Sequence, residues 1–281
     1  MSSFAPVSKV VQSGNLQWHI STAGTGPLAL LIHGTGASVH SWDNLAPLLA
    51  PYYTVVMMDL PGHAGTATPS SADLTLPGIA SSLFKLINQE NLFADVIIGH
   101  SAGAAIMLEL CLQHPECAKH LVSINAAVMP LGGLAGYLFS PLARMSASTH
   151  WMPRFFSYRA RNDRNIRKLL DSTGSIVDQK SFRRYAELFC DPSHVSGVLR
   201  MMANWHLEKL VPRLGQLEHS IQLIAASDDK TIPLRDSYKL QQLLPSDKVT
   251  LSIINGRGHL LHEEDPTSVA QLIIDPANHE H

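Results

Sequence analysis

The chain has 281 residues but only three cysteines, Cys111, Cys117 and Cys190. An odd number of cysteines without regular spacing offers neither a disulfide framework nor the paired ligands of a structural zinc site. The first residues also lack the basic segment and the apolar segment that together mark a secretion signal. These absences predict a protein of a reducing compartment, and we expect it in the cytoplasm.

The chain also lacks a large excess of charge of either sign. The formal net charge is −2, which argues against a nucleic-acid partner because such proteins carry a basic excess. The chain has no internal repeat and no low-complexity tract. With 45% hydrophobic and 16% charged residues, it has the composition of a globular protein with a sizeable core. Its length fits one large domain, or such a domain with an insertion.

One stretch, residues 121–143, contains no charged residue and is long enough to cross a bilayer. Asn125, two prolines and three glycines interrupt it, and its first part is needed as a strand. We therefore expect no transmembrane helix.

What the sequence does contain is an alternation of short apolar runs, typical of buried strands, and longer segments with helical spacing. The expected strands are 7–11, 17–22, 28–32, 54–58, 95–98, 120–124, 221–226 and 249–254. The expected helices are 41–49, 76–92, 104–112, about 235–244 and about 261–274. This order predicts an α/β fold with a mostly parallel sheet covered by helices on both faces.

Residues 130–214 interrupt the alternation. Glycine and proline cluster at 130–141, and several short helical segments follow without a strand signal. We predict a helical cap over 130–214, inserted into a core made of residues 1–129 and 215–281.

The strongest chemical signal is Gly99-His100-Ser101-Ala102-Gly103, which follows an apolar strand and opens an apolar helix. In this context a G-x-S-x-G turn lifts a serine above the sheet as a nucleophile. We predict that role for Ser101, with the Ala102 N–H as an oxyanion donor. The glycine-rich residues 33–36 follow another buried strand, so we predict the Thr35 N–H as the second donor. Turns without chemistry are the alternative at both places.

A serine hydroxyl needs a base, and the base needs a carboxylate that orients it. His259 follows the last expected strand, and the carboxylates of Asp228 and Asp229 follow the strand before it. We predict that His259 is the base and that one of these two residues is the acid.

Several motifs, in chain order, resemble those of the α/β-hydrolase superfamily. They are His33-Gly34, Asp59-x-Pro61-Gly62-His63, the G-x-S-x-G turn, Asp229-x-x-Ile232-Pro233 and Gly258-His259-x-x-His262-x-Glu264. The resemblance covers nearly the whole chain and implies the α/β-hydrolase fold. It also implies that Asp229 is the acid, because in that family the acid lies three residues before a Val/Ile-Pro pair. The turn at residues 63–66 departs from the family pattern.

Longer stretches, some of which include these motifs, resemble one subgroup, the magnesium-chelatase accessory α/β-hydrolases of bacteriochlorophyll biosynthesis, called BchO. These stretches are 33–42, 100–105, 139–144, 172–175, 201–205 and 258–264. The resemblance implies a pathway, tetrapyrrole metabolism, with magnesium chelatase as a candidate partner, and it implies no particular reaction.

Two functions follow. The first is a serine hydrolase acting on an ester-like bond of a small apolar substrate, and the second is a non-catalytic accessory protein that binds or delivers a porphyrin intermediate. The full set of triad and oxyanion residues favours the first. We expect no cofactor and no metal, because His259-x-x-His262-Glu263 matches neither order of the helical zinc signatures. We expect His262 and Glu264 to tie the His259 loop to the last helix.

The expected substrate-binding residues come from both parts of the chain: Gly34, His40, His100, Trp151, Phe155 and Met202. His40 has helix capping as an alternative role, and His100 has core packing.

The expected cap is also basic. Residues 154–184 contain nine basic and three acidic residues, a balance of +6, next to several aromatic residues. This combination suits peripheral contact with an anionic membrane, and it equally suits an apolar ring system with carboxylates, such as a porphyrin. A solvated helix face is the third alternative.

Overall fold

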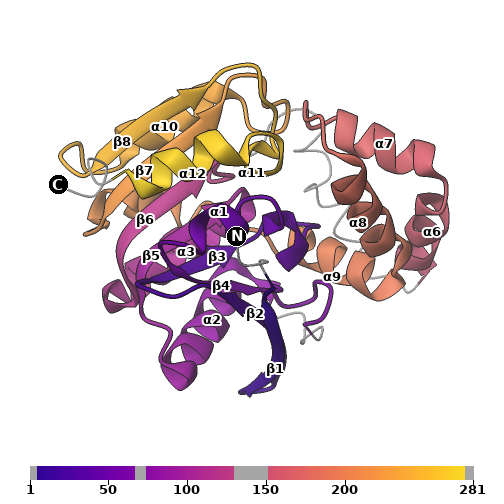
Figure 1. The fold of residues 1–281 in the computed structure, drawn as a ribbon, viewed down its shortest axis with the longest axis horizontal. Coiled ribbons are helices and arrows are strands. Elements are labelled where there is room, and N and C mark those ends of the chain that lie inside the picture. The colour runs from indigo at the N-terminus through magenta and orange to yellow at the C-terminus, as the bar shows by residue number, and fades with distance from the viewer. Residues whose placement is uncertain (1–4, 67–73, 130–150, 276–281) are drawn as a thin grey trace.

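The computed structural model describes residues 5–66, 74–129 and 151–275. Its strands form an eight-stranded sheet in the order β1-β2-β4-β3-β5-β6-β7-β8 (Figure 1). They are β1 (Val7–Ser13), β2 (Leu16–Ala23), β3 (Leu28–Ile32), β4 (Thr54–Met58), β5 (Ala94–His100), β6 (Ala118–Ile124), β7 (Ser220–Ala226) and β8 (Val249–Ile254). Strand β2 pairs antiparallel with β1 and β4, whereas all other neighbours are parallel. The expected mostly parallel sheet is confirmed.

Helices cover both faces of this sheet, and β3 shows why. Its alternate side chains enter two separate cores, Leu30 and Ile32 in one and Ala29 and Leu31 in the other, and all four are fully buried. The first core is closed by α2 (Leu76–Glu90), α3 (Ala102–Gln113) and α10 (Leu234–Leu243). The second is closed by α1 (Ala46–Leu49) and α12 (Pro266–Ile274).

Two helices that the sequence predicts as continuous are broken, so the prediction was wrong there. Residues 41–49 divide between a 3-10 turn, η1 (Val39–Trp42), and α1, while 261–274 divides into α11 (Leu261–Glu264) and α12. Pro47 and Pro266 lie at the starts of α1 and α12, where the missing N–H is tolerated, but neither can continue a helix from the preceding turn. The other predicted elements lie within two residues of their observed bounds. Further 3-10 turns are η3 (Pro115–Cys117) and η4 (Val211–Gln216).

Between β6 and β7, the described residues 151–203 form four α-helices. They are α6 (Trp151–Ala160), α7 (Asp163–Asp171), α8 (Gln179–Cys190) and α9 (Pro192–Ala203). Figure 1 shows them beside the sheet rather than on either of its faces. They have a core of their own, built from residues such as Ile166 and Phe182, which also receives Ala37 and Leu260 from the sheet domain. The boundaries 130 and 214 stay a prediction, and residues 130–150 lie outside the described ranges.

Helix α9 packs closely on the turn after β4. Gly62 has a φ of +81°, and a Cβ atom on Gly197 of α9 would overlap the Gly62 backbone. Glycine is therefore required on both sides of this contact. In the described part of the chain, no helix is long and apolar enough to cross a membrane.

Candidate active site

Ser101 lies on the sharp turn between β5 and α3. Its φ of +53° and ψ of −117° are unusual for a residue with a side chain. Its N–H donates to the Ile124 carbonyl at 3.0 Å, which anchors the turn to β6. A Cβ atom on Gly99 would lie 2.6 Å from Ala104 Cα, so the two arms of the turn approach as closely as glycine permits. The strand, turn and helix occur as the G-x-S-x-G pattern predicts.

The structure brings Ser101, His259 and Asp229 together in a row. The Ser101 hydroxyl donates to His259 Nε2 at 3.0 Å, and His259 Nδ1–H donates to Asp229 Oδ2 at 2.7 Å. All three residues are buried. Such a row can move the serine proton to the imidazole while the carboxylate stabilises the imidazolium.

The second Asp229 oxygen is held by the chain that follows it. Oδ1 accepts the N–H groups of Thr231 and Ile232 at 2.7 and 2.8 Å. Asp228 is exposed instead, and its carboxylate accepts a hydrogen bond from Ser227. The geometry therefore distinguishes the two carboxylates and favours Asp229.

The predicted oxyanion donors lie on two neighbouring loops. Ala102 is the first residue of α3, and the loop containing Thr35 passes directly over the nucleophile, because a Cβ atom on Gly34 would lie 3.0 Å from Ser101 Cβ. Among the described residues, neither the Ala102 nor the Thr35 N–H has a hydrogen-bond acceptor. Both groups are therefore available to a ligand oxygen.

Three buried histidines hold the 33–36 loop. His33 Nδ1–H donates to the Gly34 carbonyl, the Gly36 N–H donates to His63 Nε2, and His194 Nε2–H of α9 donates to the Gly36 carbonyl. Burial lowers the pKa of all three, that of His194 to about 4, so they are neutral at physiological pH. Sequence reasoning missed His194, whose only local signal is a polar residue in a helix.

Asn125 fixes the His259 loop from below. Its Nδ2 donates to the His259 carbonyl at 2.9 Å and to the Gly258 carbonyl at 3.2 Å, while Oδ1 accepts the Ala226 N–H at 2.8 Å. Its φ is +45°, and the residue is buried. Asn125 thus links the ends of β6 and β7 to the base, a role that sequence reasoning also missed.

His100 supports the same carbonyl. Its Nε2–H donates to the His259 carbonyl at 2.9 Å, and burial lowers its pKa well below the usual value. The buried ring matches the packing alternative, since its contact is with the His259 backbone. Gly34 lies against Ser101. Of the six expected substrate-binding residues, His100 and Gly34 therefore lie beside the triad.

The segment after α7 reaches the triad loops from the other side. The Thr173 carbonyl accepts the His259 and Lys230 N–H groups, each at 3.2 Å, and Ser175 Oγ accepts the Leu260 N–H at 2.7 Å. In the sequence, residues 172–175 carry only the resemblance to the chelatase-related subgroup. The contacts show that this segment fixes both loops.

Glu264 ties the His259 loop to the last helices, as expected. Its carboxylate accepts the N–H groups of Gly258 at 2.9 Å and Ile176 at 3.2 Å. For His262 the structure shows core packing instead, since neither ring nitrogen has a hydrogen-bond partner among the described residues. Its ring centroid lies 4.6 Å from that of Trp42 and 4.3 Å from that of His100.

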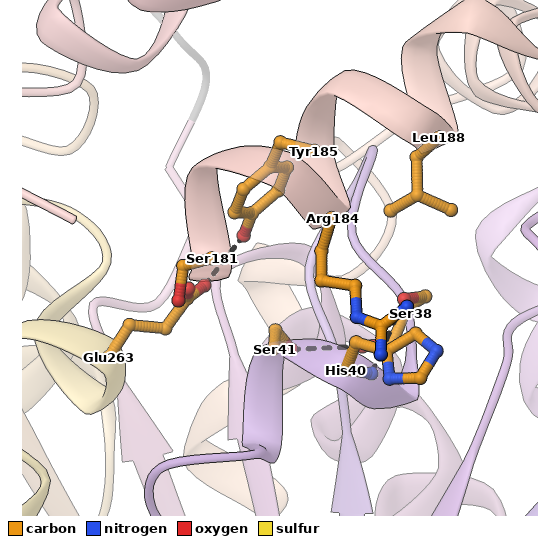
Figure 2. Close-up of a pocket in the computed structure, with 8 residues that line it drawn as sticks. All are labelled: Ser38, His40, Ser41, Ser181, Arg184, Tyr185, Leu188 and Glu263. Atoms are coloured by element: carbon orange, nitrogen blue, oxygen red, sulfur yellow. Dashed lines mark hydrogen bonds between the residues drawn. The ribbon is translucent and has the colours of Figure 1, made fainter. Parts of the chain in front are cut away.

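Glu263 faces α8 across a small polar cavity between η1 and α8. Figure 2 shows the Tyr185 hydroxyl pointing at the Glu263 carboxyl group, and the two are hydrogen-bonded at 2.7 Å. Burial raises the pKa of Glu263 to about 8, although the Tyr185 hydrogen bond opposes this shift. His40 lines the same cavity, which none of the triad residues lines.

The remaining expected substrate-binding residues lie on α6 and α9. Trp151 and Phe155 are exposed on α6, with their ring centroids 6.2 Å apart, and Met202 of α9 is partly buried. The structure brings neither aromatic side chain into the polar network of the triad.

The sequence pattern of the alpha/beta hydrolase family matches residues 29–272. The chain belongs to the alpha/beta hydrolase family. It is 36% identical over 264 residues to the magnesium-chelatase 30 kDa subunit of Rhodobacter capsulatus, covering 93% of this chain and 91% of that protein. This confirms the expected resemblance to the chelatase-related subgroup.

More distant similarities follow the same fold. The 2-hydroxy-6-oxo-6-phenylhexa-2,4-dienoate hydrolase of Burkholderia cepacia is 22% identical, with 93% of this chain and 91% of that hydrolase covered. Among solved structures, the epoxide hydrolase CorEH superimposes with a TM-score of 0.80 at 18% identity, with 96% of this chain and 98% of that chain covered. The protein lip1 of Acinetobacter baumannii AYE superimposes with a TM-score of 0.79 at 20% identity, with 96% of this chain and 90% of that chain covered. These structures establish the α/β-hydrolase fold for this alpha/beta hydrolase.

Proposed function

We propose that this alpha/beta hydrolase is a serine hydrolase that cleaves an ester-like bond of a small apolar substrate. The observation that carries the proposal is the buried row of Ser101, His259 and Asp229, joined at 3.0 and 2.7 Å. The backbone N–H groups of Ala102 and Thr35, on two loops beside Ser101, support it further.

In the proposed reaction, His259 takes the hydroxyl proton as Ser101 Oγ attacks the carbonyl carbon. The oxygen of the tetrahedral intermediate accepts hydrogen bonds from Ala102 and Thr35. The bond to the leaving alcohol then breaks, and the alcohol takes its proton from His259. In the second half, water gives a proton to His259 and attacks the acyl carbon. The bond between that carbon and Ser101 Oγ then breaks, His259 returns the proton to Oγ, and the acid is released.

A second function has its own support. The similarity to a protein named as a magnesium-chelatase subunit favours a place in tetrapyrrole synthesis, with magnesium chelatase as a partner. In this alternative the chain binds or delivers a porphyrin intermediate, and the Ser101 site does no chemistry.

A fluorophosphonate probe separates the two functions. Stoichiometric labelling of the wild type, lost in Ser101→Ala and strongly slowed in His259→Ala, supports the hydrolase. The control Ser227→Ala changes an exposed-loop hydroxyl beside Asp228 and should label like the wild type. A folded wild type that is not labelled and cleaves no p-nitrophenyl ester contradicts the hydrolase, and copurification with a porphyrin then favours the accessory function.

A further inference from the structure

Helix α6 exposes a stripe of aromatic side chains. Trp151, Phe155 and Tyr158 follow one another at spacings of four and three residues and are 62%, 47% and 69% exposed. The opposite side of the helix is buried against α8 and α9 through Pro153, Ser157 and Ala160. Of the seven aromatic side chains that are strongly exposed in the described ranges, four belong to α6. One side of the helix therefore packs on the rest of the protein, and the opposite side exposes apolar side chains to solvent.

Basic residues border this stripe. Arg154 and Arg159 flank it on α6, and the basic residues that follow are Arg161, Arg164, Arg167 and Lys168. In the described part of the chain, none of these six side chains has an ion-pair partner, and Asp163 is paired with Arg183 at 3.2 Å. Residues 151–171 carry a net charge of +4 while the whole chain carries −2, so the rest of the chain is at −6. The positive charge is therefore concentrated on α6, which carries the aromatic stripe, and on α7, which follows it.

The position of the stripe leaves it free to meet a large surface. Figure 1 shows α6 and α7 at the side of the molecule farthest from β8 and α10. The stripe is the outer side of a single helix, which presents its side chains outward. The basic side chains next to the aromatic residues have no ion-pair partner in the described ranges, so this surface is positively charged and complements an anionic one. Tryptophan and tyrosine next to arginine are also the composition that lies at the headgroup level of an anionic bilayer.

We propose that α6 and the start of α7 form a docking surface for an anionic lipid bilayer. The aromatic stripe enters the headgroup region, and the surrounding arginines contact the lipid phosphates. Docking would present the helical part of the molecule to the membrane, and α7 leads directly into residues 173–175, which hold the His259 loop. The proposal goes beyond the hydrolase function and does not depend on it.

The experiment is co-sedimentation of the full chain with phosphatidylglycerol/phosphatidylcholine vesicles, compared with pure phosphatidylcholine vesicles. We expect binding to the anionic vesicles that falls at least about tenfold between about 0.01 M and about 1 M salt, where the Debye length shrinks from about 30 Å to about 3 Å. Equal binding to both vesicle types, or binding that salt does not change, overturns the proposal.

Tryptophan fluorescence reports which surface binds. Trp18, Trp42 and Trp205 are buried, so Trp151 dominates the response of emission to the surroundings. We expect its emission to shift to the blue on anionic vesicles and to be quenched by brominated lipid. Trp151→Phe should still sediment but lose this signal. Sedimentation of the wild type without any spectral change assigns the contact to another surface and overturns the proposal.

Charge reversal supplies a matched pair of variants. Arg159→Glu, Arg161→Glu and Arg164→Glu together should reduce binding at least about tenfold, because each basic residue near an anionic surface adds a severalfold factor. The control reverses Lys85, Lys209 and Arg235, which are exposed elsewhere, and changes the net charge equally. Equal loss in both triple variants overturns the proposal. The neutral triple variant with glutamine at 159, 161 and 164 gives the same test if the glutamate variant does not fold.

Two further measurements separate this proposal from the others. Ser101→Ala should bind vesicles like the wild type, so loss of hydrolysis and loss of docking are independent results. A propionate-bearing porphyrin that quenches Trp151 in a chain that binds no vesicles assigns the surface to a small anionic ligand and overturns membrane docking.

Discussion

Ser101 holds a backbone conformation that only its surroundings make tolerable. A residue with a side chain at φ +53° costs of order 1–3 kcal/mol, and such strain collects at functional sites. The turn is held from both sides, since the Ser101 N–H donates to Ile124 and the Ser101 carbonyl accepts from Ala127. These hydrogen bonds offset the strain, and the strained conformation points the Ser101 hydroxyl at His259.

The two adjacent aspartates provide the first prediction. Asp229→Asn should lower turnover of a p-nitrophenyl ester by about 10⁴, the loss seen when a protease triad loses its carboxylate. Asp228→Asn should have little effect, because Asp228 is exposed and bonds Ser227 instead. The same ranking should appear in the rate of fluorophosphonate labelling. A larger loss in Asp228→Asn would contradict the assignment of the acid.

Asn125 provides the second prediction. Asn125→Asp places a carboxylate oxygen against the His259 and Gly258 carbonyls, where the amide now donates. We expect unfolding free energy to fall by about 1–3 kcal/mol and kcat to fall more than KM rises. Because a protonated aspartic acid can donate again, the ratio of the variant's kcat to that of the wild type should rise as the pH is lowered. Asn165→Asp, in the α6–α7 region, is the control, and an equal effect there would contradict a positioning role.

At the scale of helices and loops, the contact between α8 and the sheet domain includes a titratable carboxyl group, that of Glu263. Tyr185 of α8 donates to Glu263 of α11, and both residues are buried. The carboxyl group titrates near 4.5 in an unfolded chain and at about 8 here. Between these pH values the unfolded state releases a proton that the folded state keeps. The stabilising contribution is therefore complete below pH 4.5 and is lost as the pH rises to about 8.

Glu263→Gln should remove this pH dependence while keeping an acceptor for Tyr185. We expect the variant to be more stable than the wild type at pH 8.5, by about 1–4 kcal/mol, and nearly equal to it at pH 4.5. Urea unfolding at both pH values measures the difference. Glu187→Gln changes an exposed carboxylate on α8 and should alter stability little at either pH. A variant that is less stable than the wild type at pH 8.5 would show that the carboxylate itself is needed.

For the molecule as a whole, buried neutral histidines predict sensitivity to acid. His33, His63, His100, His194 and His262 all have a pKa lowered chiefly by burial, in the sheet domain and in α9. A histidine of this kind stabilises the fold fully above pH 6.5, and the contribution is lost as the pH falls below that value. The unfolding free energy should therefore decrease steeply from pH 7 to pH 5.

His262→Phe tests this at one site. The ring packs on Trp42 and His100, and burial lowers its pKa to about 3. Phenylalanine keeps the packing and cannot bind a proton, so between pH 7 and pH 5 the variant should lose about 2 kcal/mol less than the wild type. His206→Phe, at an exposed histidine, is the control. Parallel losses in His262→Phe and the wild type would contradict the buried neutral state.

The sequence by itself predicts most of the strands, the long helices and the Ser101 turn. These features are local: apolar spacing records which side of an element is buried, and G-x-S-x-G occupies five consecutive residues. The order of the motifs also predicts which strand ends supply the base and the acid, since the ends of parallel strands lie along one edge of a sheet. Local spacing failed at Pro47 and Pro266, where a continuous apolar pattern hides a break in the backbone.

Only the tertiary structure decides which distant groups support the site. Asn125 meets the His259 loop 134 residues further along the chain, and Tyr185 meets Glu263 across 78 residues. The pairing of such groups depends on how whole elements pack, and no periodicity in the sequence encodes it. The same holds for α6. The sequence predicts that Trp151 and Phe155 line a substrate pocket, but the opposite side of the helix packs on α8 and α9 and leaves these side chains exposed.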